Sequence, residues 1–189
     1  MRDLGLLVNL KFIVMRGNAA EVGAMIDLAA KLQLPYQADC TITGRYDGTK
    51  GSLATRVDIP TLAGLYGGPL RKHLSKRKAH PTDDEFKCNC ARTNCGIFSS
   101  GDVSPCIAGP LAAGNVKRQS FREVWRESPV FRRIRDLRVE DFASCAPCPL
   151  KAWCRRSPGP PVSLHGEFTG IDPWVCEEAA EIRNILEKP

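Results

Sequence analysis

Two groups of cysteines constrain the fold of this chain more than any other feature of its sequence. The first group lies in the stretch CNCARTNCGIFSSGDVSPC, which runs from Cys88 to Cys106. The second group lies nearer the C-terminus and comprises Cys145, Cys148, Cys154 and Cys176. A glycine turn at Gly101 predicts a short hairpin, whose return strand would carry Cys106 back toward the cysteines before it. Two thiolate-rich sites are therefore expected.

Composition narrows the class of protein. The chain has 189 residues, enough for one large or two small domains, and its nine cysteines come without a secretion signal. Many cysteines without a secretion signal predict a cytoplasmic location. Disulfides are rare in the cytosol, so clustered cysteines there usually indicate metal or redox chemistry. The apolar segment GLLVNLKFIVM contains Asn9 and Lys11 and is too short to span a membrane. No interaction with a membrane is expected.

The net charge of +6 comes from local groups of basic residues. These groups are Arg71, Lys72, Lys76, Arg77 and Lys78 before the first cysteines, and Arg132, Arg133, Arg135 and Arg138 between the two cysteine groups. Aromatic residues do not alternate with them, as they would on a surface that stacks bases. Solvated or ligand-steering faces are therefore favoured over a nucleic-acid interface.

The first 45 residues predict a strand, a helix and a second strand. A strand is expected from about Val8 to Met15, followed by a helix that Asn18 caps in a capping box with Glu21. Residues 36–42 predict the second strand, parallel to the first. Parallel strands need neighbours on both sides, so this unit is expected to be part of a larger sheet or barrel. Arg45 and Asp47 in the next loop either contact a ligand or pair with each other.

The rest of the chain is expected to be a linker followed by a second domain. Glycine, proline and basic residues predict a linker over residues 59–85. Beyond it, Ser120 with Glu123 predicts a capped helix, and Pro129 begins another. A final helix is expected at 177–186, directly after Cys176.

The spacing of the second cysteine group favours an iron-sulfur cluster over zinc. Structural zinc sites usually have two C-x2-C pairs separated by a spacer, whereas this group has one such pair, at Cys145 and Cys148. Three thiolates on one short loop and a distant fourth suit a cluster. A zinc-stabilised scaffold or interaction module without catalytic activity stays open as the alternative.

At this point the sequence resembles a known family. The segments CNCARTNCGIFSSGDVSPC, CAPCPLKAWCRRSPG and GIDPWVCEEAAEIR are similar to successive parts of the SPASM domain of radical S-adenosylmethionine (radical SAM) enzymes, such as sulfatase, pyrroloquinoline quinone and mycofactocin maturases. The resemblance implies an α/β fold: a fragment of a partial TIM-like (β/α)6 barrel at 1–58, the linker at 59–85, and a small α+β SPASM domain at 86–189. Residues 6–58 resemble the fifth and sixth strands of that barrel.

The resemblance also implies two [4Fe-4S] clusters. The ligands of the outer cluster would be Cys145, Cys148, Cys154 and Cys176. Those of the inner cluster would include Cys88 and Cys106, with Cys95 at a position where many members have cysteine. Ser157 stands where a further cysteine is expected, so the fourth inner ligand is either the additional Cys90 or Ser157, or the site is open for substrate. Cys40 is interpreted as a small core residue.

The chain departs from the family in one important respect. It contains no C-x3-C-x2-C, the motif whose cluster cleaves S-adenosylmethionine, and the first four barrel strands have no counterpart here. Whether the chain alone is an enzyme is left open. The resemblance predicts the C-terminal part of an oxidoreductase-type maturase of peptides or proteins, either truncated or encoded separately from an N-terminal radical SAM partner chain. S-adenosylmethionine is expected only if the missing half of the barrel is supplied. Residues near strand ends are candidates for contacting the cofactor: Arg16, Asn18, Asp39 and Arg45.

Overall fold

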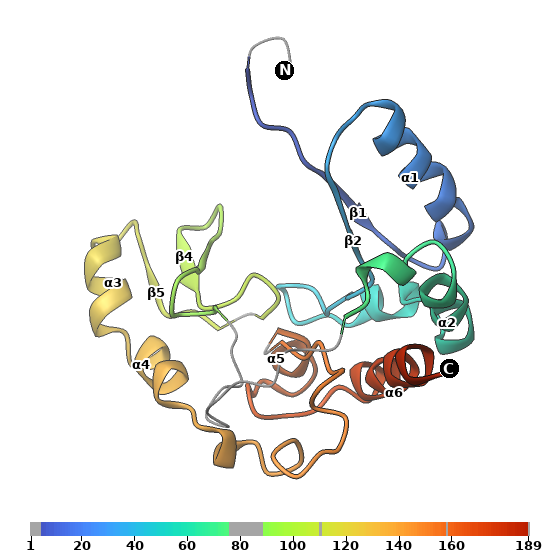
Figure 1. Cartoon of the computed structure of the whole chain (residues 1–189). Coiled ribbons are helices and arrows are strands. Elements are labelled where there is room, and N and C mark those ends of the chain that lie inside the picture. The colour runs from blue at the N-terminus through green and yellow to red at the C-terminus, as the bar shows by residue number, and fades with distance from the viewer. Residues whose placement is uncertain (1–4, 76–88, 110, 158, 189) are drawn as a thin grey trace.

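The elements run from two parallel strands near the N-terminus to a long helix at the C-terminus (Figure 1). The computed structural model describes residues 5–75, 89–109, 111–157 and 159–188. The strands are β1 (Leu10–Ile13), β2 (Tyr36–Asp39), β3 (Gly96–Ile97), β4 (Asp102–Ser104) and β5 (Gly114–Asn115). The helices are α1 (Val22–Lys31), α2 (Ile59–Gly67), α3 (Phe121–Glu127), α4 (Pro129–Asp136), α5 (Gly159–His165) and α6 (Pro173–Glu187). Short 3-10 helices cover Ala19–Glu21, Gly51–Thr55, Arg71–His73 and Val139–Asp141.

The N-terminal unit has the predicted strand, helix and strand order. β1 pairs with β2 in parallel, with Leu10 opposite Tyr36 and Phe12 opposite Ala38, and α1 connects the two strands. The second strand is shorter than expected and ends at Asp39. The predicted parallel arrangement is confirmed.

The predicted capping box at Asn18 is wrong. The Asn18 side chain binds back to the end of β1: its Oδ1 accepts from the Met15 amide at 2.7 Å and its Nδ2 donates to the Ile13 carbonyl at 3.0 Å. A 3-10 helix separates Asn18 from α1, and no side chain caps either helix. The local bonds to the strand end compete with the capping geometry for the same short side chain.

A first hydrophobic core joins the N-terminal unit to the last helix. Leu62 and Tyr66 of α2 are in the same buried cluster as Ile182 and Ile185 of α6 and Val14, which follows β1. α2 and α6 lie side by side in Figure 1. The beginning of the predicted linker is therefore a packed helix. Its last residues, 76–85, lie outside the described part of the chain, and the domain boundary stays a prediction.

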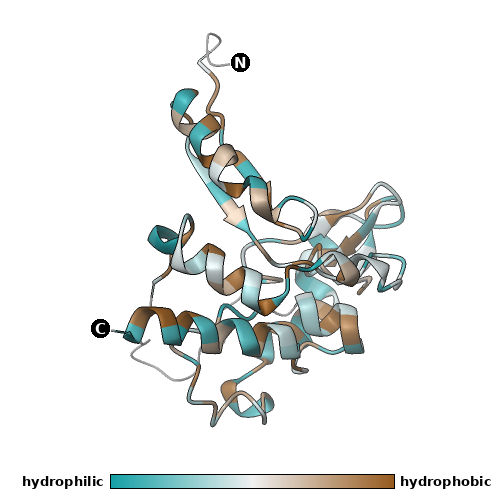
Figure 2. Cartoon of the chain, turned by 90° about the vertical axis from the view of Figure 1, so that its right-hand side faces the viewer, coloured by the Kyte–Doolittle hydropathy of each residue, from teal (hydrophilic) through white to brown (hydrophobic). Residues whose placement is uncertain are grey.

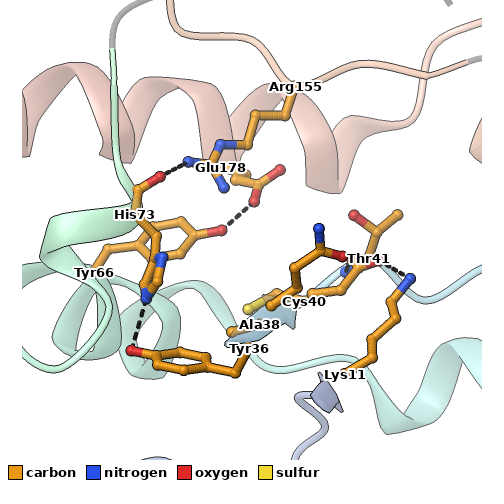
Figure 3. Close-up of a pocket in the computed structure, with 11 residues that line it drawn as sticks. Lys11, Tyr36, Ala38, Cys40, Thr41, Tyr66, His73, Arg155 and Glu178 are labelled. Carbon is orange, nitrogen blue, oxygen red and sulfur yellow. Dashed lines mark hydrogen bonds and ion pairs between the residues drawn. The ribbon is translucent and has the colours of Figure 1, made fainter. Parts of the chain in front are cut away.

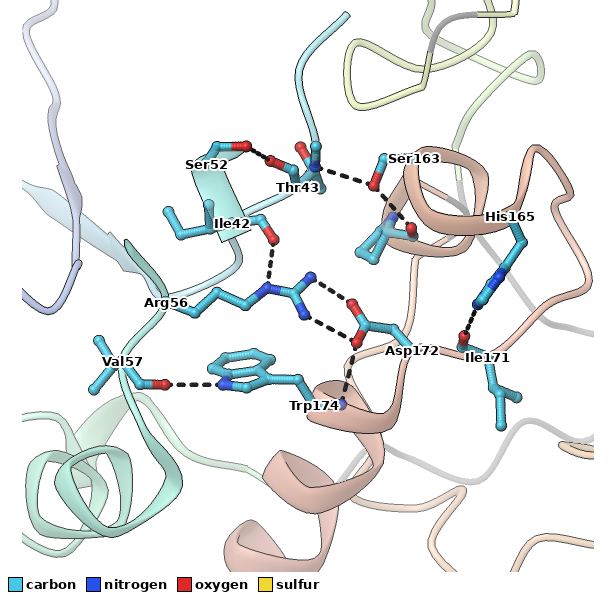
Figure 4. Close-up of polar contacts among 12 residues, drawn as sticks. Ile42, Thr43, Ser52, Arg56, Val57, Ser163, His165, Ile171, Asp172 and Trp174 are labelled. Atoms are coloured by element: carbon cyan, nitrogen blue, oxygen red, sulfur yellow. Dashed lines mark hydrogen bonds and ion pairs between the residues drawn. The ribbon is translucent and has the colours of Figure 1, made fainter. Parts of the chain in front are cut away.

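Polar contacts reinforce the same junction (Figure 4). The Arg56 guanidinium binds the Asp172 carboxylate and the Ile42 carbonyl. The Trp174 indole donates to the Val57 carbonyl at 2.9 Å. These contacts hold the start of α6 against the segment that leads into α2.

The predicted hairpin around Gly101 is confirmed. β3 and β4 pair antiparallel with Gly96 opposite Ser104, and β5 adds a third strand on the other side of β4. Gly101 has a φ of +90°, and a Cβ there would lie 2.8 Å from the Asn115 side-chain oxygen. Only glycine adopts this positive φ without strain and leaves room for the Asn115 side chain. The return strand β4 then leads directly to Cys106.

A second core lies under this three-stranded sheet. It contains Val103 of β4 with Val124 of α3 and Phe131 and Ile134 of α4. The capping box that begins α3 is confirmed, since Ser120 Oγ accepts from the Glu123 amide at 3.2 Å. The proline start of α4 is confirmed as well.

The last helix begins earlier than the sequence suggested. Asp172 caps α6 by accepting from the Trp174 amide at 3.1 Å, and Pro173 is its first residue. Cys176 therefore lies in the first turn of the helix, and the predicted start at Glu177 is wrong. Asp172 and Pro173 determine where the helix begins. Aspartate is a favourable N-cap residue, and the backbone amide that proline lacks would have no partner in the first turn of a helix.

The described residues form a mixed α/β structure with two small sheets. The helix that ends at the C-terminus, α6, shows both hydrophobic and hydrophilic residues (Figure 2). None of the helices in the described ranges combines the length and the hydropathy needed to cross a membrane.

Candidate metal centre

The loop that carries Cys145, Cys148 and Cys154 is a series of tight turns. The Cys145 amide donates to the Phe142 carbonyl at 2.8 Å, and the Cys148 amide donates to the Cys145 carbonyl at 3.1 Å. The Cys154 amide closes a further turn by donating to the Leu150 carbonyl at 3.0 Å. Phe142 anchors the beginning of this loop, since it is only 3% exposed. The backbone thus presents three thiols from one short segment.

Cys176 joins this loop from the first turn of α6. Partial burial of its thiol, and then the nearby Cys145 and Cys148, raise the pKa of Cys176, while Arg156 acts in the opposite direction. Electrostatic effects of this kind fall off with distance. The assignment of Cys145, Cys148, Cys154 and Cys176 as outer ligands stays a prediction.

The four cysteines of this group offer thiolates, which can bind either zinc or an iron-sulfur cluster. In the segments that the structure describes, no three histidine, cysteine, aspartate or glutamate side chains gather tightly enough to hold one metal ion. A zinc ion draws four ligands onto one centre. A [4Fe-4S] cluster binds each thiolate at a different iron and so needs wider spacing. The four cysteines supply as many thiolates as one such cluster takes.

Hydrogen bonds hold the loop around Cys106. The Ala108 amide donates to the Cys106 sulfur at 3.5 Å. Hydrogen bonds to a ligating sulfur stabilise its negative charge and tune a bound cluster. The buried Ser104 hydroxyl bonds the carbonyls of Cys106 and Gly109 at 2.9 and 2.8 Å, which fixes the loop after β4.

The start of α5 lies against Cys106. A Cβ on Gly159 would come within 3.2 Å of the Cys106 sulfur and 2.4 Å of the Ala108 Cβ. Ser157 is two residues before Gly159 and half-buried. The segment in which the resemblance expects the fourth inner ligand therefore packs beside Cys106.

The other inner candidates lie on the turn before β3. Cys90 is 7% exposed, and its backbone forms an isolated β-bridge with that of Asn94. Cys95 is half-buried, and its burial raises the pKa of its thiol. Cys88 lies outside the described residues. The assignment of the inner ligands stays a prediction.

The four residues predicted to contact the cofactor have different surroundings. Asn18 is bound to the end of β1, as described above, while Arg16 and Arg45 are exposed. Asp39 pairs with Lys11 at 3.2 Å and lines a cavity. The Asp47 side chain bonds the Thr49 amide and hydroxyl at 2.9 and 2.6 Å, and these bonds are the main cause of its lowered pKa. Their roles stay predictions.

The cavity beside Asp39 contains residues that the sequence did not single out. They include Tyr66, Arg155 and the buried Glu178. One signal was present: Glu178 falls at helical spacing between the apolar residues Val175 and Ile182. A carboxylate on an apolar helix face has to find a polar partner in the fold.

Comparison with known proteins identifies the cysteine-rich region. Residues 88–149 match the family model of SPASM, an iron-sulfur cluster-binding domain. Residues 88–149 carry the sequence pattern of a SPASM domain. The predicted resemblance to radical SAM/SPASM-domain proteins is thereby confirmed, and the match favours iron-sulfur binding over the zinc alternative.

Curated relatives of this SPASM-domain protein share one name. An AdoMet-dependent heme synthase of Methanosarcina barkeri is 34% identical over 80 residues, which cover 42% of this chain and 23% of the relative. Proteins of the same name from Nitratidesulfovibrio vulgaris and Oleidesulfovibrio alaskensis are 32% and 27% identical, over 60% and 75% of this chain and 32% and 36% of their own lengths. The chain thus spans between about a quarter and about a third of these relatives.

Proposed function

We propose that this chain is the C-terminal, cluster-binding part of an S-adenosylmethionine-dependent enzyme of the heme synthase type. The observation that carries the proposal is the common name of the three relatives, whose matches cover up to 75% of this chain. The SPASM domain supports the iron-sulfur part of the proposal. The peptide or protein maturase expected from the sequence is the second candidate, and the SPASM match supports it equally well.

Two [4Fe-4S] clusters are proposed. The outer ligands are Cys145, Cys148, Cys154 and Cys176, and the inner ligands are drawn from Cys88, Cys90, Cys95 and Cys106. Clusters of this kind supply one-electron transfer when bound. The backbone contributes at one of these thiols, since the Ala108 amide faces the Cys106 sulfur.

We infer that β1 and β2 are the last strands of a partial (β/α)6 barrel. Among the described strands, each of them pairs only with the other, so their outer edges can accept further strands. The remaining barrel strands and the C-x3-C-x2-C would come from a preceding segment or a partner chain. S-adenosylmethionine would bind there, with Arg16, Asn18, Asp39 and Arg45 as candidate contacts. The cytoplasmic location stays a prediction.

Anaerobic reconstitution of the full chain with iron and sulfide tests the cluster assignment. Two [4Fe-4S] clusters correspond to about eight irons per chain. The variants Cys145→Ser and Cys176→Ser should lose about half of this iron, whereas the matched Cys40→Ala should keep all of it. Full iron in the outer variants would refute the assignment, and a colourless zinc protein would support the scaffold alternative.

A second measurement separates the two candidate functions. Heme is a tetrapyrrole, so a heme synthase type protein should quench the fluorescence of a free-base porphyrin that carries carboxylate side chains. A peptide maturase should leave that fluorescence unchanged. Saturable quenching at micromolar porphyrin, retained in Cys40→Ala, would favour the first candidate.

A further inference from the structure

A cavity of about 380 Å³ lies between β2 and the side chains of α2 and α6 (Figure 3). Its walls include the aromatic ring of Tyr36, the thiol of Cys40, and polar groups from Tyr66, Arg155 and Glu178. Its volume is in the range of pockets that bind small molecules. None of these residues is among the proposed cluster ligands.

Glu178 is the least exposed charged group of this cavity, at 3%. Its Oε1 accepts a hydrogen bond of 2.5 Å from the Tyr66 hydroxyl, and Figure 3 shows the two side chains pointing toward each other. Its second oxygen, Oε2, accepts no hydrogen bond from the residues that the structure describes. A buried carboxylate oxygen without a hydrogen-bond donor favours a ligand that donates a hydrogen bond to it.

Arg155 places the opposite charge on the same cavity. Its Nη2 donates to the His73 carbonyl at 2.7 Å, and the guanidinium lies 5.8 Å from the centre of the Tyr66 ring. A guanidinium has five N–H donors, so most of them are available to an anionic group.

Arg155 and Glu178 do not form a direct ion pair. In the described part of the chain no ion pair joins them, whereas Lys11 and Asp39 on the same cavity are paired at 3.2 Å. The cavity therefore offers one unpaired positive group and one unpaired negative group, next to the apolar faces of Tyr36 and Ala38. A molecule with both charges and an apolar body complements these three features together.

We propose that this cavity binds a small zwitterion of the α-amino acid class with an apolar side chain. The ammonium group of the ligand donates to Glu178 Oε2, and its carboxylate accepts from the Arg155 guanidinium. The side chain of the ligand packs on Tyr36. The proposal is independent of the heme synthase assignment, since it involves neither the proposed cluster ligands nor a tetrapyrrole.

Calorimetric titration of the full, cluster-loaded chain tests the proposal, with L-phenylalanine as the probe. Two analogues each lack one charge: 3-phenylpropanoate has no ammonium group, and phenethylamine has no carboxylate. L-Phenylalanine should bind about tenfold or more tightly than either analogue, because each charged hydrogen bond contributes that much. An equal affinity for all three would overturn the proposal.

Two variants make the test specific. Glu178→Gln should lose phenethylamine binding and keep 3-phenylpropanoate binding, and Arg155→Gln should show the reverse. Arg126→Gln, on the distant helix α3, is the matched control and should bind all three compounds as the original chain does. Circular dichroism and iron content verify the fold, and the retained analogue in each variant verifies the cavity.

Other outcomes contradict the proposal directly. Absence of L-phenylalanine and L-leucine binding up to millimolar concentration would overturn it. Binding of S-adenosylmethionine without binding of free amino acids would also overturn it, because the cavity would then serve the cofactor. Amino acid binding that survives both variants would place the ligand elsewhere.

Discussion

Arg56 and Asp172 form a bidentate ion pair between segments 116 residues apart. The Nη1–Oδ1 and Nη2–Oδ2 distances are 3.0 and 2.5 Å, and both side chains are largely buried. Asp172 also caps α6, the helix that carries Cys176 and Glu178. The pair thus connects the N-terminal unit to the helix that contributes to both candidate sites.

Breaking this pair should destabilise the protein strongly. Arg56→Gln leaves Asp172 buried without its countercharge, which costs about 3–5 kcal/mol. For a chain of this size, the melting temperature followed by circular dichroism should fall by about 6 to 20 °C. The matched control Lys11→Gln removes an exposed ion pair, so it should cost at most about 1 kcal/mol. Equal effects of the two variants would contradict the role of the buried pair.

A methyl group at Gly159 should disturb the inner cluster. The added Cβ of Gly159→Ala would meet the Cys106 sulfur and Ala108, and such overpacking costs about 1–3 kcal/mol. The iron content after reconstitution should fall from about eight toward about four per chain. Gly17→Ala, which meets no atom within 4 Å, serves as the control. Unchanged iron in Gly159→Ala would place the inner cluster away from Cys106.

The fourth inner ligand can be tested by two single changes. If Ser157 stands in for a cysteine beside Cys106, Ser157→Cys should raise the stability of the inner cluster toward chelators. If Cys90 is the ligand instead, Cys90→Ser should lower the iron content by about four per chain. Electron paramagnetic resonance of the reduced protein would report each change. If neither variant alters the inner cluster, both assignments are wrong.

The hairpin before Cys106 should tolerate no side chain at Gly101. Gly101→Ala combines a φ of +90° with a contact of 2.8 Å to Asn115, so it should cost about 1–3 kcal/mol. Gly23→Ala in α1 meets nothing within 4 Å and should stabilise the helix by about 0.5–1 kcal/mol. Opposite shifts in melting temperature are the expected result. A neutral Gly101→Ala would mean that the turn relaxes without cost.

Cys40 should be the least reactive of the described thiols at moderate pH. Burial, and secondarily Glu178, raise the pKa of Cys40 from 9.0 to about 11. Its alkylation by iodoacetamide in the cluster-free chain should stay slow at pH 9 and accelerate as the pH approaches 11, as measured by mass spectrometry of its peptide. Because the pKa is raised in the folded state, the contribution of Cys40 to the free energy of unfolding is complete below pH 9 and lost as the pH rises through about 11.

Urea-unfolded protein is the control for this measurement, and there Cys40 should react like an ordinary thiol. A folded Cys40 that reacts as fast as the exposed Cys176 would contradict its burial in the core.

The sequence by itself determined the local features around the metal sites. The two cysteine groups, the turn at Gly101 and the capping box at Ser120 depend on neighbours a few residues apart, and the structure has the turn and the capping box as predicted. The iron-sulfur character follows from cysteine spacing in the same way, and the SPASM match agrees with it. The capping box at Asn18 failed because the end of a strand competed for the same side chain.

Only the tertiary structure decided which distant residues meet. It packed α2, in a segment predicted as a linker, against α6, and it joined Tyr66 to Glu178 across 112 residues. It also placed Cys176 in the first turn of α6. Such pairs depend on how helix faces bury their apolar residues together, and a buried polar group then bonds to whatever partner that packing places within reach. Periodicity in one segment contains no information about the partner segment, which is why the cavity at Glu178 emerged only from the fold.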